Sequence, residues 1–100
     1  MYQNLTPKII IKTIEKNKDK LKRFGVIKIG LFGSYLKQTT NKKSDIDFLV
    51  LFDVPNFDNY IELKFLLEKL FHKKIDLVIE DSLKPSLNYI KREAIYAKRL

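Results

Sequence analysis

The amino-acid sequence predicts a small α/β fold, in which a mixed β-sheet is flanked by helices. Three stretches carry this prediction. Residues 7–24 repeat apolar side chains at helical spacing, residues 26–32 alternate them as a strand does, and residues 45–52 form a second strand that is apolar on both sides. Because a strand with two apolar faces needs cover above and below, we expect helices on both faces of the sheet.

Length and composition indicate one compact domain over residues 1–100. The chain is 45% hydrophobic, which supports a core, and it has no cysteine, so disulfide frameworks and thiolate metal sites are excluded. Its start lacks the layout of a signal peptide, and no apolar run is long enough to cross a bilayer. We therefore expect a cytoplasmic protein with no membrane partner.

The chain is strongly basic, with a formal net charge of +8. Such a charge attracts nucleic acid or acidic partners. However, the lysines are spread along the whole chain, which is also rich in Ile and Asn, as an AT-rich genome would produce. A solvated basic surface is therefore favoured over a dedicated nucleic-acid face.

The first predicted helix begins at Thr6-Pro7, with Thr6 as N-cap and Pro7 at the first helical position. Its apolar stripe consists of Ile10, Ile14, Leu21 and Phe24. Gly25 is the expected left-handed residue that ends this helix.

The strand at residues 26–32 is expected to place Ile27, Ile29 and Leu31 on one face. Gly30 then lies on the other face, where the missing side chain permits close approach of a ligand or of backbone. After the Gly33-Ser34 turn, residues 35–37 are predicted to form a short helix, and residues 38–43 a loop.

The second half of the chain adds a strand, a helix, a strand and a helix. Residues 45–52 direct their even-numbered apolar side chains to the core, residues 58–71 form a helix, and residues 73–79 form the third strand. The tail is predicted to form a last helix that begins near Pro85.

Two carboxylates lie at the start of the second strand. Asp45 and Asp47 project to the same side because side chains alternate along a strand. Their mutual repulsion is relieved by a divalent cation, and hard oxygen ligands of this kind suit Mg²⁺. Upstream, the Gly33-Ser34 turn offers backbone N–H groups and a hydroxyl to an anion. Together these features indicate nucleotide chemistry.

The order and spacing of these motifs closely resemble the signature of the polymerase-β-type nucleotidyltransferase superfamily. The motifs are Phe32-Gly33-Ser34 and Asp45-Ile46-Asp47-Phe48, and ten residues separate them. More narrowly, residues 44–50, 75–78, 83–85 and 93–96 are similar to the minimal nucleotidyltransferases, so the resemblance spans Val26 to Tyr96. It implies a palm-like nucleotidyltransferase fold.

The resemblance also implies transfer of AMP from ATP to a hydroxyl, with catalytic and metal-binding roles for Asp45 and Asp47. Two Mg²⁺ ions, or Mn²⁺ in their place, would serve the reaction. Asp76 matches the third carboxylate of the superfamily. Independently, a lone Asp in an apolar strand is costly to bury without a partner; the alternative is a strand-end Asp that faces water.

For the triphosphate, the resemblance implies binding by Gly33 and Ser34, with Lys37 as a further nucleotide-binding residue. The family commonly has Arg at the position of Lys37 and Gly at that of Gln38. Lysine neutralises phosphate as a point charge but lacks the bidentate fork of arginine.

The implied partner is a HEPN-domain toxin, adenylylated on a tyrosine, with this chain as the antitoxin. Two alternatives remain: an antitoxin that neutralises its partner by binding alone, and a basic nucleic-acid-binding module. The three carboxylates favour the enzyme, and the sequence leaves the oligomeric state open.

Overall fold

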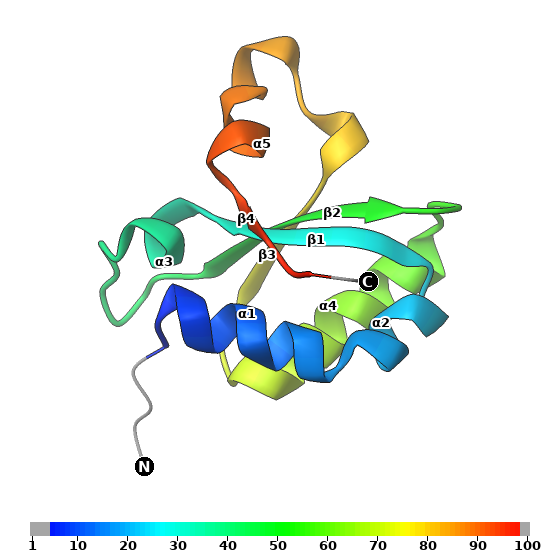
Figure 1. Ribbon diagram of the computed structural model, residues 1–100, viewed down its shortest axis with the longest axis horizontal. Helices are drawn as coiled ribbons and strands as arrows, with labels where there is room; N and C mark the ends of the chain where they lie inside the picture. The colour runs from blue at the N-terminus through cyan, green and yellow to red at the C-terminus, as the bar shows by residue number, and fades with distance from the viewer. Residues whose placement is uncertain (1–4, 99–100) are drawn as a thin grey trace.

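The computed structural model describes residues 5–98 and shows a four-stranded sheet with helices packed against it (Figure 1). Three predicted strands and the long helix before the third are confirmed, and their bounds shift by at most two residues. In chain order the elements are α1 (Pro7–Lys16), α2 (Lys18–Arg23), β1 (Val26–Phe32), α3 (Gly33–Lys37), β2 (Ile46–Phe52), α4 (Phe57–Phe71), β3 (Ile75–Ile79), the 3-10 helices η1 (Glu80–Ser82) and η2 (Pro85–Leu87), α5 (Tyr89–Glu93) and β4 (Ile95–Tyr96).

The sheet is mixed, as predicted, with strand order β3-β2-β1-β4. β1 runs antiparallel to both β2 and β4, whereas β2 and β3 are parallel. The parallel pair needs a crossover, and α4 provides it. As a result, the first residues of β2 and β3 lie side by side at one end of the sheet.

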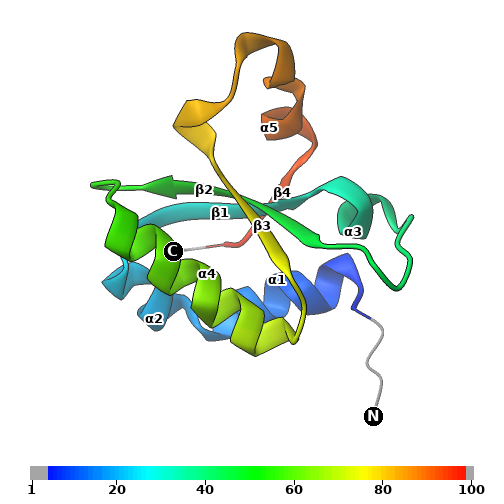
Figure 2. The same ribbon diagram turned by 180° about the vertical axis from the view of Figure 1, so that it is seen from behind.

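The two faces of the sheet are covered differently (Figures 1 and 2). Helices α1, α2 and α4 lie together beneath one face, which we call the lower face. Above the other, the upper face, the chain from η1 to α5 rises and returns as β4. The prediction of helices on both faces therefore holds fully for the lower face alone. Above the upper face, the helices that the structure describes within residues 5–98 are η1, η2 and the five-residue α5. Even so, Leu49 on the upper face is fully buried.

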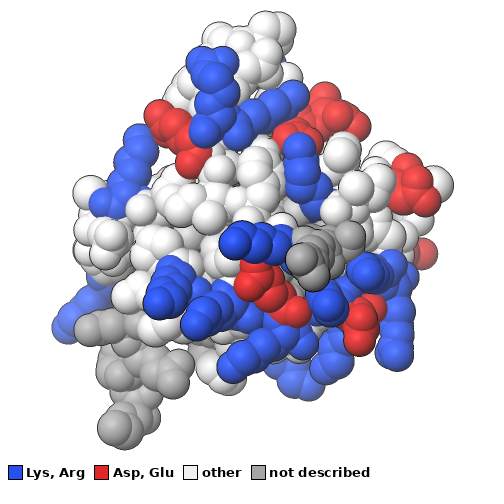
Figure 3. Space-filling model, in the orientation of Figure 1, with Lys and Arg blue, Asp and Glu red and all other residues white. Residues whose placement is uncertain are grey.

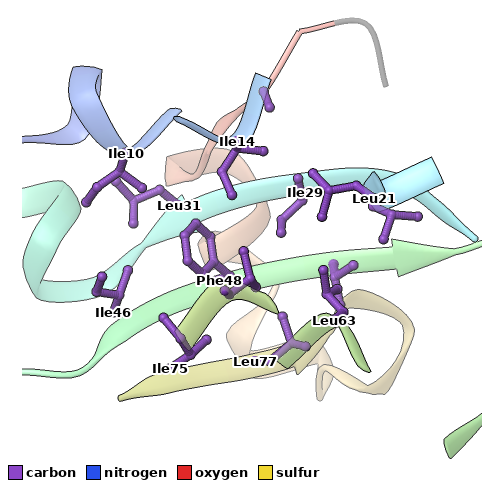
Figure 4. Packing of buried hydrophobic residues seen from close by; sticks show 14 of the residues in the cluster. Ile10, Ile14, Leu21, Ile29, Leu31, Ile46, Phe48, Leu63, Ile75 and Leu77 are labelled. Atoms are coloured by element: carbon purple, nitrogen blue, oxygen red, sulfur yellow. The ribbon is translucent and has the colours of Figure 1, made fainter. Parts of the chain in front are cut away.

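The hydrophobic core fills the space between the lower face and its three helices (Figure 4). Phe48 is fully buried at its centre, and its ring centroid lies 5.8 Å from that of Phe71 on α4. Its labelled neighbours in the cluster are Ile10, Ile14, Leu21, Ile29, Leu31, Ile46, Leu63, Ile75 and Leu77. Packing of this kind fixes β1, β2 and β3 as one rigid support.

The first helix begins as predicted but is broken in two. The Thr6 hydroxyl accepts a hydrogen bond from the backbone N–H of Ile9 and caps the N-terminus of α1. At Asn17 the side chain donates to the Thr13 carbonyl at 2.8 Å, which competes with the helical backbone pattern, and α1 ends there. α2 then ends before Gly25, whose φ of +79° confirms the predicted left-handed residue. None of the helices in residues 5–98 has the length and apolar character required to cross a membrane.

The predicted orientation of Ile27 is wrong. The register between β1 and β2 shifts between Val26 and Lys28, so that an extra residue stands in β1. Ile27 is consequently 49% exposed, whereas Ile29 and Leu31 are buried as predicted.

The predicted last helix is also wrong in extent. Residues 85–96 form η2, the short α5 and then β4, an edge strand that pairs with β1 at Gly30 and Leu31. Tyr96 of β4 covers Gly30, where an added Cβ would lie 2.8 Å from the tyrosine ring. The close approach predicted at Gly30 is therefore made by a side chain of the same protein.

Candidate active site

The Gly33-Ser34 turn follows β1 directly and is held against the start of β2. Gly33 has a φ of +76°, which disfavours any residue with a side chain, and a Cβ at this position would overlap the carboxylate of Asp47. The backbone N–H of Ser34 donates a hydrogen bond to the same carboxylate. Glycine is thus required because backbone and carboxylate approach each other so closely.

Asp47 and Asp76 face each other across the parallel pair. They are aligned partners in the β2–β3 register, and both project from the upper face because Phe48 and Leu77, their chain neighbours, point into the core. Asp45 lies one residue before β2. The structure therefore brings the carboxylates of two strands to one end of the sheet, next to Gly33.

Asp76 does not sit in an apolar interior. Its side chain is exposed, and so is that of Asp45, whereas Asp47 is partly buried. The expectation that burial makes Asp76 costly is therefore wrong, and the alternative of an aspartate in contact with water describes its environment. What distinguishes Asp76 is its position opposite a second carboxylate.

The electrostatics of the site are dominated by Asp47. Burial raises the pKa of its carboxyl from 3.8 to about 6, and the hydrogen bond with Asp76 and the negative charges of Asp76 and Asp45 add to the rise. The Ser34 N–H acts in the opposite direction, since it stabilises the charged form. The site thus concentrates negative charge that the protein alone does not neutralise.

The donor set fits a magnesium ion that shares its coordination with a nucleotide. Within residues 5–98 the ion pairs are Lys28 with Glu80 and Lys37 with Glu93, so none of the three aspartates of the site is paired with a cation. No three acidic, His or Cys side chains in this part of the chain stand close enough to enclose an ion. Mg²⁺ commonly takes one or two protein carboxylates and completes its shell with water and phosphate oxygens. The pair formed by Asp47 and Asp76 supplies that many.

Lys37 lies on α3, but its ammonium group is engaged elsewhere. Its Nζ is 3.8 Å from the Glu93 carboxylate at the end of α5, and both side chains are about half exposed. This contact links α3 to the segment above the upper face. Glu93 was not identified from the sequence as a site residue; the only signal was that residues 93–96 resemble the end of the minimal nucleotidyltransferases.

A second polar cluster anchors the segment above the upper face. Glu80 is buried, accepts a hydrogen bond from the Tyr96 hydroxyl at 3.0 Å, and forms an ion pair with Lys28 at 3.3 Å. Lys28 also lies over the Tyr96 ring. Burial, followed by the hydrogen bond and charge of Glu80, raises the pKa of Tyr96 to about 12. These contacts join β1, η1 and β4.

Comparison with known proteins identifies relatives over nearly the whole chain. The family model described as nucleotidyltransferase domain matches residues 10–100. The protein adenylyltransferase MntA of Thermococcus cleftensis is 41% identical over 81 residues, which covers 79% of this chain and 82% of that protein.

Solved structures share the fold. A minimal nucleotidyltransferase superposes with a TM-score of 0.78 and 28% identity, covering 94% of this chain and 98% of the other. A toxin–antitoxin structure with AMP-PNP matches with a TM-score of 0.66 and 28% identity, over 86% of this chain and 73% of the other. A tri-AMPylated Shewanella oneidensis HEPN toxin in complex with its MNT antitoxin matches with a TM-score of 0.54 and 28% identity, over 80% and 64%.

Proposed function

The chain belongs to the nucleotidyltransferase domain family, and from this premise we propose that it transfers AMP from ATP to a tyrosine hydroxyl of a partner HEPN toxin. In this role it is the antitoxin of a toxin–antitoxin pair and acts as a single domain in the cytoplasm, where ATP is available. The observation that carries the proposal is the alignment of Asp47 with Asp76 across β2 and β3, beside the Gly33-Ser34 turn.

The carboxylates would hold the metal. Asp45, Asp47 and Asp76 are the residues we assign to two Mg²⁺ ions, with Mn²⁺ as a substitute. When bound, such ions stabilise charge on the entering and leaving oxygens of a phosphoryl displacement. The protein contributes a fixed pair of aspartates on adjacent strands of a packed sheet, so the ligands need little reorganisation.

The triphosphate would lie against α3. Gly33 keeps the backbone clear of side-chain atoms at this point, and Ser34 adds a hydroxyl. Lys37 reaches the phosphates once it leaves Glu93, and because exposed ion pairs contribute little free energy, this exchange costs about 1 kcal/mol or less.

In the reaction, the tyrosine oxygen forms a bond to the α-phosphorus of ATP while the bond between the α- and β-phosphates breaks. The tyrosine loses its hydroxyl proton, and pyrophosphate leaves. We assign a protein acceptor because few residues of the domain lie outside its sheet and helices. The domain therefore has little material with which to build a separate binding site for an acceptor, and a protein acceptor can bring its own binding surface. The similarity to MntA of Thermococcus cleftensis and to the antitoxin bound to a tri-AMPylated toxin supports this choice.

The test of this proposal is whether one molecule of this protein inactivates many molecules of the toxin. An excess of the cognate toxin is incubated for hours with this protein, ATP and Mg²⁺, the protein is removed, and the toxin is weighed by mass spectrometry and assayed for RNA cleavage. We expect lasting inactivation and a mass gain of one or more AMP units.

The control is the double variant Asp45→Asn/Asp47→Asn, which should add no mass. Inhibition that requires equimolar protein, ignores ATP and reverses on separation would instead identify an antitoxin that acts by docking alone.

A further inference from the structure

The face of the molecule opposite the site carries the largest concentration of positive charge. Residues 7–23, which form α1 and α2, contain seven Lys and Arg residues and two acidic ones, so they supply five of the eight net charges of the chain. All seven basic side chains are exposed. Figure 3 shows them gathered over the part of the surface where α1 and α2 lie in Figure 1. We call this surface the basic face.

The basic face is separate from the nucleotide site. α1 and α2 cover the lower side of the sheet, whereas Asp47 and Asp76 project from its upper side. The sheet and the core lie between them. A ligand on the basic face therefore leaves the upper face free, and the charge there does not serve ATP.

These cations are not neutralised within the described residues. Neither ion pair in residues 5–98 involves α1 or α2. Of the two acidic residues in this stretch, Glu15 accepts a hydrogen bond from the backbone N–H of Lys98, so its carboxylate is directed to the C-terminal segment. The structure thus leaves the positive charge available to an external anion.

We propose that the basic face binds the phosphate backbone of a nucleic-acid duplex without sequence preference. Lys8, Lys12 and Lys16 follow one another at four-residue intervals, so they form a row with steps of about 6 Å along α1. A duplex presents one phosphate charge per roughly 1.7 Å of its axis. Because the phosphates are spaced more closely than the lysines, the row can contact phosphates at any position along the duplex.

The composition of the basic face distinguishes among polyanions. Protein interfaces are depleted in lysine and have an apolar centre. The basic face is rich in lysine, and among residues 7–23 its one large exposed apolar side chain is Ile9. Single-stranded nucleic acid is held largely by stacking on aromatic rings. Residues 7–23 contain no aromatic residue. A duplex backbone, which needs charge alone, fits best.

The test is a salt titration of binding to a labelled 20-base-pair RNA duplex, followed by fluorescence anisotropy. About five phosphate contacts give a slope of about −4.5 in log K against log salt, so affinity should fall roughly 500-fold between 50 and 200 mM salt. A DNA duplex of the same sequence should bind within about threefold, and the single strand more weakly. No binding at 100 µM protein in 50 mM salt would overturn the proposal.

Two triple variants locate the contact. Lys12→Glu/Lys16→Glu/Lys20→Glu should lower the magnitude of the slope by about 2.7, since three contacts are lost. Lys42→Glu/Lys43→Glu/Lys84→Glu changes the net charge equally at exposed positions outside the basic face, and it should keep the slope near −4.5. Equal losses in both variants would mean that net charge, and not the basic face, is responsible.

Replacement variants and competition experiments complete the binding test. If the charge-reversed variant does not fold, the three glutamine substitutions at the same positions replace it. Competition by poly-glutamate as strong as that by duplex at matched charge would assign the face to an acidic polypeptide and overturn the inference, as would tighter binding of the single strand. Stabilisation by ATP with Mg²⁺ should be unchanged in the triple variants of the basic face.

Discussion

The lower and upper faces of the sheet differ in what their side chains contribute to stability. On the lower face, Phe48 and its neighbours are buried against three helices, and the burial of their apolar surface favours the folded state. On the upper face, Asp47 and Asp76 are set opposite each other with no cation of the described residues beside them. Strand β2 therefore has two opposite effects on the free energy of unfolding. Its core-facing side chains, such as Phe48, increase it, whereas Asp47 on the upper face decreases it. Such a local conflict is typical of a binding site.

The largest expected effect is on activity. Asp47→Asn should lower the rate of AMP transfer by about 10²–10³-fold, because it removes one charge of the preorganised pair. Circular dichroism should show an unchanged fold, since no core volume is lost. The readout is radiolabelled AMP incorporated into the toxin under single-turnover conditions.

The matched control for this variant is Asp19→Asn on α2, far from the upper face, which should retain full activity. A normal rate for Asp47→Asn, or an unfolded variant, would show that Asp47 has a structural role.

The second effect is on stability, on the lower face. Phe48→Ala should reduce the free energy of unfolding by about 3–5 kcal/mol, because a fully buried ring in contact with Phe71 is lost. Leu51→Ala on the upper face, where the side chain is only partly buried, should lose about half as much or less.

Urea unfolding measures both values, and Phe48→Leu replaces the alanine variant if that protein does not fold. Equal losses at positions 48 and 51 would contradict the contrast between the faces.

A smaller effect is expected where β4 is anchored. Tyr96→Phe removes the hydroxyl that donates to the buried Glu80 and should reduce stability by about 1.5 kcal/mol, which lowers Tm by roughly 6–12 °C. Tyr89→Phe, at an exposed tyrosine on α5, should leave Tm within about 2 °C. If the two variants melt together, the contact with Glu80 does not anchor the strand.

The sequence predicted the lower face better than the upper one, and the difference has a physical cause. Burial of Ile46, Phe48 and Val50 follows from alternation along one strand, which is a local property. The exposure of Ile27 depends on a register shift between β1 and β2, and β4 exists only because residues 95 and 96 meet β1. Each of these pairings depends on a second strand elsewhere in the chain, so the local sequence of one segment does not predict it.

The site divides in the same way. The positions of Gly33, Asp45 and Asp47 follow from a contiguous motif, and Asp76 came from a resemblance together with a burial argument that proved wrong, since the side chain is exposed. The contact of Lys37 with Glu93 joins residues 56 positions apart, which no local spacing indicates.

The smallest effect isolates the electrostatic cost of the site. In EDTA, the raised pKa of Asp47 means that the folded state holds a proton more tightly than the unfolded state, so stability falls as pH rises from about 4 to about 6. Because the group is partly exposed, we expect a loss of about 1 kcal/mol. Asp47→Asn should lack this component and should melt a few degrees higher than the parent protein at pH 7. The same pH dependence in both proteins would assign the loss to other carboxylates.

Thermal unfolding with ATP and Mg²⁺, added separately and together, tests most directly whether the upper face is completed by a metal–nucleotide complex. We expect a large rise in Tm only when both are present, equivalent to about 2.7 kcal/mol at 100 times the dissociation constant, and no rise in Asp47→Asn. An equal rise with ATP in excess EDTA, or an unchanged response in Asp47→Asn, would contradict this expectation.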